Sequence, residues 1–377
     1  MKPSKTSLLI VVLLWSLMQA LLLFKNGIVT DGEAEKYISE ANLFLSTGKF
    51  TSNSFWLYST QIFLLITGMV TKVGFVFVVI VQLLFNLLAT LTFYSFTGKL
   101  FSKPAALTGT IILILTYPFQ EFNTFLQTES LYYSFTIIFS CQLLQLTRVT
   151  ALSFLAITSA LILISITRPT GILFVPCTFL YLFFRFLKTI SAGKKLLIVS
   201  AVTVAFLYFL NLALGSGGEL DFMLPYLNEH IICGVPTLQQ SADIKTATDG
   251  NSLYGLFYYI THNPGQFLSL AWRRTLAFFG LVRSYYSTGH NVYLAVYFYP
   301  VYILFIAGIR YWTKKEPSLL LYLLACVVIN WITILLTCDD WHNRFFLTIW
   351  PYLIVLALPV INKLFDKYTS NNNNASA

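Results

Sequence analysis

Long apolar stretches separated by short polar segments dominate this chain of 377 residues. Several of the apolar runs exceed the roughly 18 residues that a helix needs to cross a lipid bilayer. The pattern predicts an all-α, polytopic bundle of about ten membrane-spanning helices. The expected spans are Ser7–Phe24, Val73–Phe96, Ala105–Tyr117, Leu131–Leu146, Leu152–Ile166, Ile172–Leu187, Leu196–Leu214, Val292–Ile309, Leu319–Leu336 and Phe346–Ile361.

Two further apolar segments are ambiguous, and we interpret both as helices on the membrane surface. Ser54–Val70 is only marginally long enough to cross a bilayer, and polar side chains lie near its start. Phe267–Leu281 contains Arg273 and Arg274, and arginine is costly at the centre of a bilayer. The first of these segments would belong to an outer loop that carries short surface helices.

The distribution of charged side chains supports this topology. The chain is 57% hydrophobic and 10% charged, whereas a soluble domain has about 25% charged residues. With the amino terminus in the cytoplasm, the ten spans place 14 of the 24 Lys and Arg residues inside and 13 of the 15 Asp and Glu residues outside. Cytoplasmic loops are expected to be rich in cations. The net charge of +9 therefore indicates membrane topology, and no nucleic-acid partner is predicted.

The chain is expected to form one membrane domain, residues 1–369, with outer loops at 26–72 and 215–290. The tail, residues 370–377, contains four consecutive Asn residues and is predicted to be disordered. Five cysteines without regular spacing favour neither a metal cluster nor a disulfide framework. The sequence predicts no cofactor or metal ligand, and it leaves dependence on a divalent metal open.

The first outer loop concentrates acidic residues in a chain that is otherwise poor in charge. Thr30 and Glu33 have the spacing of a capping box, and Gly48 is a suitable stop, so we predict a helix that ends near Phe50. Its apolar positions form one stripe at helical spacing, namely Ala34, Tyr37, Ile38, Ala41 and Leu45. The helix is expected to lie along the membrane surface, with Asp31 at its entrance.

Asp31 is the candidate general base. A carboxylate beside an apolar surface has a raised proton affinity, which suits the removal of a proton from a hydroxyl group. The alternative is that Asp31 is a first-turn acid that complements the helix dipole. Glu33 and Tyr37 on the same helix, and Glu121 and Glu129 between the third and fourth predicted spans, are expected to support the site.

Arg168 and Arg344 are among the cations that the ten-span arrangement places on the outer side, against the positive-inside trend. Arg168, within Thr167–Gly171, suits a phosphate, because its guanidinium group matches two phosphate oxygens. The alternatives are an ion pair with Glu129 or an interaction with lipid headgroups. Arg344 is a second candidate for phosphate binding, with His342 as a supporting residue, and its alternative role is an interfacial anchor.

These residues, in this order, resemble the GT-C superfamily of membrane glycosyltransferases. The superfamily includes the protein O-mannosyltransferases and bacterial transferases of the RgtA/B/C/D-like type. Five segments carry the resemblance, namely Asp31 followed by Tyr37 and Ala41, Lys72-Val73-Gly74, Pro118 through Glu129-Ser130-Leu131, Thr167-Arg168-Pro169-Thr170-Gly171, and Arg344-Phe345-Phe346 with Pro351. One departure is that Gly32 follows Asp31, where the O-mannosyltransferases have a second acid.

The resemblance implies a glycosyltransferase of the cell envelope, transferring a hexose or a pentose from polyprenyl phosphate or diphosphate. Asp31 would activate the acceptor, and Arg168, with Arg344, would hold the lipid phosphate. The expected location is a bacterial plasma membrane, with membrane lipid around the protein and the active site facing outward. The resemblance leaves open the sugar, the length of the lipid, the oligomeric state and the acceptor, which is a glycan, a lipid or a protein.

Two other functions fit parts of the pattern. A polymerase or ligase of surface polysaccharide would use the same donor, but it would rely on Arg and His residues in a late loop. A flippase for lipid-linked sugars, or another transporter, would show repeated halves and polar residues within its spans. The sequence has no internal repeat, which favours the glycosyltransferase.

Overall fold

The structure, a computed structural model, describes residues 5–52, 55–186, 191–215, 223–235, 244–248, 250–340 and 342–375. Parts of the predicted loop 215–290, the start of the predicted helix at 54–70 and the last two residues of the tail lie outside these ranges. Within them the chain is helical, with turns and two isolated β-bridges, which confirms the all-α prediction. The chain divides into a first unit, residues 1–178, 300–323 and 347–377, and a second unit, residues 179–299 and 324–346.

Each predicted span coincides with a helix, and most bounds differ by a few residues, although the helix of the last span continues from Ile361 to Ala375. The helices up to the middle of the chain are α1 (Lys5–Asn26), α2 (Glu33–Thr47), η1 (Phe55–Tyr58), α3 (Ser59–Val70), α4 (Phe75–Leu100), α5 (Lys103–Leu115), α6 (Tyr117–Gln120), η2 (Glu121–Thr124), α7 (Glu129–Leu144) and α8 (Ala151–Thr167). The others are η3 (Pro169–Leu173), α9 (Phe174–Phe186), α10 (Ala192–Gly215), α11 (Leu224–Leu227), α12 (Leu253–His262), α13 (Pro264–Gly280), α14 (Thr288–Lys315), α15 (Pro317–Leu336) and α16 (Arg344–Ala375).

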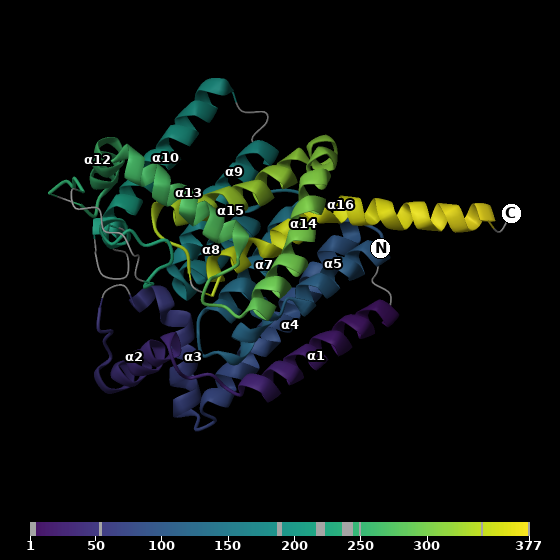
Figure 1. Cartoon of the computed structure of the whole chain (residues 1–377), viewed down its shortest axis with the longest axis horizontal. Helices are drawn as coiled ribbons and strands as arrows, with labels where there is room; N and C mark the ends of the chain where they lie inside the picture. Colours follow the sequence, from purple (N-terminus) through teal and green to yellow (C-terminus); the bar gives the residue numbers. More distant parts are fainter. Residues whose placement is uncertain are drawn as a thin grey trace. The chain divides into compact units, whose positions relative to one another are not determined.

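By length and composition, six helical segments among the described residues could cross a membrane, namely α1, α4, η3 with α9, α14, α15 and α16. A seventh is added if α5 and the segment Tyr117–Thr124, bent by 66° after Leu115, form one span. The non-helical residue at the bend is Thr116, with φ of −71° and ψ of 83°, and Pro118 has no N–H to continue the hydrogen bonds of α5. The total of ten stays a prediction. Helix α16 continues to Ala375 (Figure 1), into the segment predicted to be a disordered tail.

Helix α2 carries the acidic segment of the first outer loop. It begins at Glu33 after Gly32, whose φ of 63° suits glycine. The predicted capping box is wrong, because Gly32 occupies the cap position and Thr30 lies two residues before it. The predicted stop is confirmed, because Gly48 has a φ of 69° and its N–H donates to the carbonyl of Phe44 at 2.8 Å.

The apolar stripe of α2 packs against α3, and the two helices lie side by side in Figure 1. Ala34, Tyr37 and Ala41 are each at most 1% exposed and share a cluster with Ile62 of α3. Leu45, the last position of the stripe, is exposed. Helix α3 has 12 residues, which is about 18 Å of helix. With η1 it forms the apolar segment Phe55–Val70, which is shorter than the helices long enough to cross a membrane, and its location at the membrane surface stays a prediction.

Buried polar side chains fix the segment that leads into α7. Gln19 of α1 donates to Gln120 at 2.8 Å, and Asn123 donates to Gln19 at 3.1 Å. Ser130 of α7 donates to Asn123 at 2.5 Å. Gln82 of α4 donates to two backbone carbonyls of the same segment, at 3.2 and 2.8 Å. Because buried polar groups are costly without partners, this network holds residues 117–128 against α1, α4 and α7.

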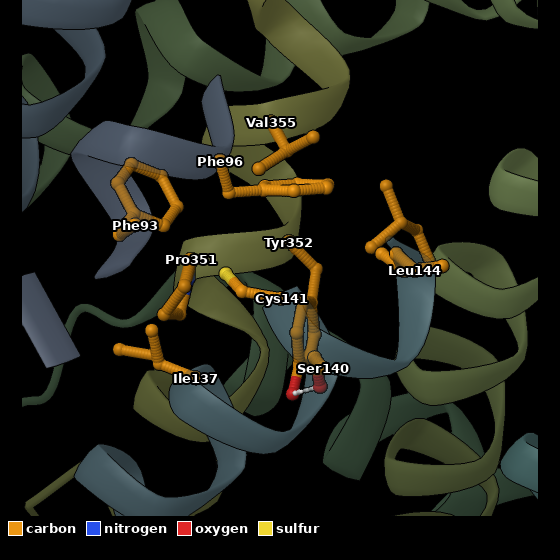
Figure 2. A pocket seen from close by; sticks show the side chains of 10 residues that line it. Phe93, Phe96, Ile137, Ser140, Cys141, Leu144, Pro351, Tyr352 and Val355 are labelled. Atoms are coloured by element: carbon orange, nitrogen blue, oxygen red, sulfur yellow. Dashed lines mark hydrogen bonds between the residues drawn. The ribbon is translucent and has the colours of Figure 1, made fainter. Parts of the chain in front are cut away.

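Further along α7, the first unit is tightly packed. The hydroxyl of Ser140 lies 2.8 Å from that of Tyr322 and 2.9 Å from that of Tyr352. Figure 2 shows the small cavity beside Ser140, which Phe96 and Val355 help to line. Its volume of about 10 Å³ is near the minimum that holds one water molecule. This end of α7 therefore belongs to the core, and a sugar does not fit there.

In the second unit, Arg274 of α13 is fully buried, although the sequence indicates a helix on the membrane surface. Its guanidinium group donates to the carbonyls of His230, Leu335 and Pro225 at 2.9, 3.0 and 3.1 Å. The guanidinium carbon lies 4.7 Å from the centre of the Tyr226 ring. Three carbonyl oxygens and an aromatic face thus replace the water that an exposed arginine would bind.

Candidate active site

The loop that carries Asp31 is joined to the segment before α7 by a parallel β-bridge. The N–H of Val29 donates to the carbonyl of Thr124 at 2.9 Å, and the N–H of Leu126 donates to the carbonyl of Val29 at 3.1 Å. Because the bridge is parallel, both chains continue in the same direction, one toward α2 and the other toward α7. Asp31 is exposed two residues beyond Val29, and Glu129 opens α7 four residues beyond Phe125, the partner of Val29 in the bridge.

Glu129 forms a buried ion pair with Arg168. The Nη1 atom of Arg168 donates to Oε1 of Glu129. The side chain of Glu129 is fully buried, and that of Arg168 is 10% exposed. The guanidinium carbon also lies 5.9 Å from the centre of the Tyr132 ring, within the range of a cation–π interaction. This ion pair is one of the alternatives that the sequence left open for Arg168.

The segment that follows α8 presents Arg168 through a sharp turn. Pro169 comes next and opens η3, and the residue before a proline avoids helical geometry. Arg168 is accordingly extended, with φ of −156° and ψ of 139°. A Cβ atom at Gly171 would lie 2.4 Å from the carbonyl oxygen of Ile164. Only glycine therefore allows the chain to fold back this closely onto α8.

Tyr37 of α2 lies in the electrostatic field of the same ion pair. Burial raises the pKa of its phenol well above the ordinary value, the carboxylates of Glu33 and Glu129 raise it further, and Arg168 acts in the opposite direction. The phenol is therefore protonated at neutral pH and can donate a hydrogen bond. Of the supporting residues predicted on α2, Tyr37 is the one that the structure brings to Glu129 and Arg168.

Two other residues of α2 have roles that the sequence did not reveal. The ammonium group of Lys36 lies 5.2 Å from the ring centre of Tyr37 and 4.9 Å from that of Tyr58. Glu40 is 5% exposed, and its carboxylate accepts a hydrogen bond of 3.0 Å from the N–H of Thr51. Lys36 thus adds a cation beside the aromatic pair, and Glu40 closes the loop that follows the helix.

Two other predicted supporting acids of the first unit, Glu33 and Glu121, each lie near a lysine. Glu33 is half-buried and lies 4.0 Å from Lys36. Glu121 lies in η2, and the charge of Lys25 at the end of α1 acts on it. In the described part of the chain, no three His, Cys, Asp or Glu side chains are grouped as a metal site would require.

A second polar group, in the second unit, surrounds Arg283. Its Nη2 atom donates to the carboxylate of Asp339 and to the amide oxygen of Asn343, both at 2.5 Å. Asn343 also donates to the carbonyl of Leu281 at 3.0 Å. Burial raises the pKa of Asp339 to about 7, although Arg283 acts in the opposite direction. This network joins the end of α13 to the loop before α16.

The predicted site residues Arg344 and His342 belong to this second group. Arg344 donates to the carboxylate of Asp340, four residues earlier on the chain, at 2.5 Å. The same carboxylate accepts a hydrogen bond of 2.8 Å from the N–H of His342. Asp340 therefore holds the residues that open α16, and the guanidinium group of Arg344 has a carboxylate partner within its own unit.

A disulfide between Cys233 and Cys338 corrects the expectation that the cysteines form no disulfide. The two residues are separated by 105 positions, which no local spacing pattern reveals. Beside it, the N–H of Cys233 donates to the carbonyl of Asp339 at 2.8 Å. Disulfides persist in oxidising compartments, so the bond agrees with the prediction that residues 215–290 form an outer loop.

Reduction of this disulfide should destabilise the protein by about 2–5 kcal/mol, the usual effect of opening a native disulfide. The measurement is thermal unfolding of the purified protein with and without a reductant. The double variant Cys233→Ser/Cys338→Ser is the control, and reductant should not change its midpoint further. An equal response of both proteins to reductant would mean that the Cys233–Cys338 bond does not support the fold.

Comparison with known proteins shows a similarity at the level of the fold. No protein-family model matches the sequence, and a search of curated proteins found no match. Among solved structures, the chain is similar to the Archaeoglobus fulgidus oligosaccharyltransferase, whose crystal structure was determined with an acceptor peptide tethered by a disulfide bond. The TM-score is 0.53 at 13% sequence identity, over 97% of this chain and 51% of that one.

The similarity extends over nearly all of this chain, which spans about half the length of the oligosaccharyltransferase. That enzyme is a GT-C protein. Together with the long apolar helices, the comparison identifies an all-α, polytopic membrane protein with a fold of the GT-C type. The fold class expected from the sequence is therefore confirmed.

Proposed function

We propose that this chain is an integral membrane glycosyltransferase. It transfers a sugar from a polyprenyl-phosphate donor to an acceptor at the outer membrane face, with Asp31 as general base and Arg168 at the lipid phosphate. The observation that carries the proposal is the parallel bridge at Val29. It joins the loop that carries the exposed Asp31 to the segment that leads to Glu129, the buried partner of Arg168, on a fold of the GT-C type.

Asp31 is the proton acceptor in this proposal. Its carboxylate accepts the proton of the acceptor hydroxyl as the hydroxyl oxygen attacks the anomeric carbon of the donor. Asp31 suits this role because it is exposed at the end of a loop whose backbone is fixed at Val29, so that a substrate can reach a carboxylate held in place. A fixed position matters because proximity and orientation contribute much of the rate in such reactions.

The leaving group requires positive charge. As the bond between the anomeric carbon and the phosphate oxygen breaks, the electron pair goes to the lipid phosphate, which gains negative charge. Arg168 stabilises that charge, and its low exposure strengthens the interaction because little water competes. A guanidinium group has five N–H donors in a fixed plane, so it can bind Glu129 and a phosphate together.

In this proposal Glu129 and Tyr132 are positioning residues. The carboxylate and the aromatic ring hold the guanidinium group of Arg168 from two sides. Tyr37 supplies a protonated phenol near the same pair. The part that the sequence assigned to Arg344 at the phosphate stays a prediction, and its contact with Asp340 supports a structural role as well.

The proposal is tested by incubating the purified protein with a panel of radiolabelled polyprenyl-phosphate sugars in lipid vesicles that also contain acceptor extract. We expect one donor to lose its label from the lipid fraction as polyprenyl phosphate appears. A flippase would instead move intact donor across the vesicle membrane without cleaving it. Transport of intact donor without release of polyprenyl phosphate would reject the glycosyltransferase.

A further inference from the structure

A hollow of about 250 Å³ lies between the carboxyl-terminal half of α14 and the middle of α16, within the first unit. Four cationic side chains line it, namely Arg310, Lys314, Lys315 and Lys363. The volume is many times the roughly 10–15 Å³ that a single water molecule needs. It suits a phosphate-sized group better than a drug-sized ligand, whose pockets usually measure about 300–1,000 Å³.

The inner end of this basic hollow is closed by direct contact between the two helices. A Cβ atom at Gly308 would lie 2.3 Å from the carbonyl oxygen of Leu356, so the backbones touch there. The indole N–H of Trp312, one turn further along α14, donates to the same carbonyl at 3.2 Å. The hollow is therefore bounded by a rigid helix–helix contact, and its shape is a property of the fold.

The acids nearest to these cations in the sequence are Glu316, next to Lys315, and Asp366, three positions after Lys363. Among the described residues, neither Arg310 nor any of the three lysines forms an ion pair. Asp366, an acid further along α16, accepts a hydrogen bond from Asn362 at 2.8 Å. Gathering four like charges around one space is unfavourable, and a bound anion would relieve the repulsion.

Two simpler explanations account for only part of the cluster. Cations in the last turn of a helix complement its dipole, and this applies to Lys314 and Lys315 at the end of α14. It does not apply to Lys363, which lies twelve positions before the end of α16. The positive-inside bias explains why cations gather at the side predicted to be cytoplasmic, but it does not explain why they line one hollow.

The surface next to the hollow is apolar. Ile303 and Ile306, one to two turns before Arg310 on α14, are 69% and 65% exposed. Leu364 on α16, beside Lys363, is 61% exposed. A molecule whose phosphate occupies the hollow would therefore find apolar surface for a hydrocarbon chain on both helices. A free phosphate ester would leave that surface unused.

The geometry points to a binding site for an anionic phospholipid, with its phosphate in the basic hollow and its acyl chains along α14 and α16. Basic pockets between membrane helices are suited to anionic headgroups. The site is independent of the proposed sugar transfer, because Asp31 and Arg168 take no part in it. Its occupant is a lipid of the membrane and not the sugar donor.

The test compares lipid binding by native mass spectrometry of the purified protein, titrated with phosphatidylglycerol or with phosphatidylcholine. We expect the protein to retain phosphatidylglycerol selectively. The triple variant Arg310→Gln/Lys314→Gln/Lys363→Gln should bind it on the order of 100-fold more weakly, since each cation near a membrane surface contributes about 1 kcal/mol. The matched control Lys103→Gln/Arg148→Gln/Lys194→Gln removes three cations elsewhere on the predicted cytoplasmic side and should leave binding unchanged.

A second variant tests whether lipid binding depends on the space in the hollow as well as on its positive charge. Ala307 is exposed and lines the hollow, so Ala307→Trp fills the space and keeps all four cations. It should weaken phosphatidylglycerol binding by roughly tenfold or more. Equal losses in both triple variants, or full binding by Ala307→Trp, would show a diffuse electrostatic attraction and overturn the site. Displacement of the lipid by millimolar glycerol phosphate would show a site for a soluble phosphate ester and overturn the assignment to lipid.

Discussion

The substitution Asp31→Asn should reduce sugar transfer by about 10²–10⁴-fold, the usual contribution of a general base. Asn keeps the shape of the side chain and serves equally well near a helix start, so the protein should insert and fold normally. Because Asp31 is exposed, no buried partner is left unpaired. The measurement is the single-turnover release of polyprenyl phosphate, with donor binding determined separately and expected to be unchanged.

Two neighbouring acids provide the matched controls. Glu33→Gln and Glu35→Gln each remove one carboxylate from α2 without touching the bridge at Val29. Glu35 is exposed, and Glu33 is in reach of Lys36, so each change should lower the rate several-fold at most. Activity that survives in Asp31→Asn but is lost in Glu33→Gln would identify Glu33 as the base. Full activity in all three variants would assign the first loop a structural role and favour the polymerase or ligase.

Removing either member of the Arg168–Glu129 pair should destabilise the fold by about 3–5 kcal/mol, because the other member is then buried without a partner. Arg168→Ala should also weaken donor binding by about 10- to 100-fold, since a hydrogen bond to a charged group contributes about 1.5–3 kcal/mol. The double variant Arg168→Ala/Glu129→Ala separates these effects. It should regain stability relative to either single variant, yet still bind the donor weakly, as measured by thermal unfolding and by donor titration.

Arg168→Lys adds a test of geometry. It keeps the positive charge but loses the planar, two-pronged contact, so donor binding should be weaker than in the unchanged protein while the ion pair partly persists. If Arg168→Lys and the double variant both bind the donor normally, then Arg168 does not bind the lipid phosphate. The arginine would then serve only to neutralise Glu129 in the core.

The membrane helices and the stripe on α2 were predictable from the sequence, because both are periodic or continuous in the chain. Burial of Ala34, Tyr37 and Ala41 follows from helical spacing alone. The start of α2 was not predictable in the same way. Thr30 and Glu33 have the right spacing, but Gly32 adopts the left-handed conformation between them and takes the cap position.

The polar contacts between distant segments could not be predicted, because spacing carries no information on them. Nothing in the sequence singles out Arg283, yet it binds Asp339, 56 positions away. The sequence indicated the Arg168–Glu129 pair only as one of several alternatives. It gave no indication of the parallel bridge at Val29, because the bridge is formed by backbone atoms. In α2, however, the sequence does indicate one such contact. Lys36 is the only cation among its acids, which indicates a specific partner for its charge.

The disulfide between Cys233 and Cys338 imposes an order on the synthesis of the protein. A ribosome adding about 5–20 residues per second needs roughly 5–20 s to make the 105 residues that separate the two cysteines. Within that interval α12, α13, α14 and α15 must all be synthesised before Cys338 exists, so Cys233 has to wait for its partner. The three remaining cysteines are buried in α7, α9 and α15, which keeps the folded helices from capturing the waiting thiol. The covalent bond thus closes late and secures segments whose helices are already in place.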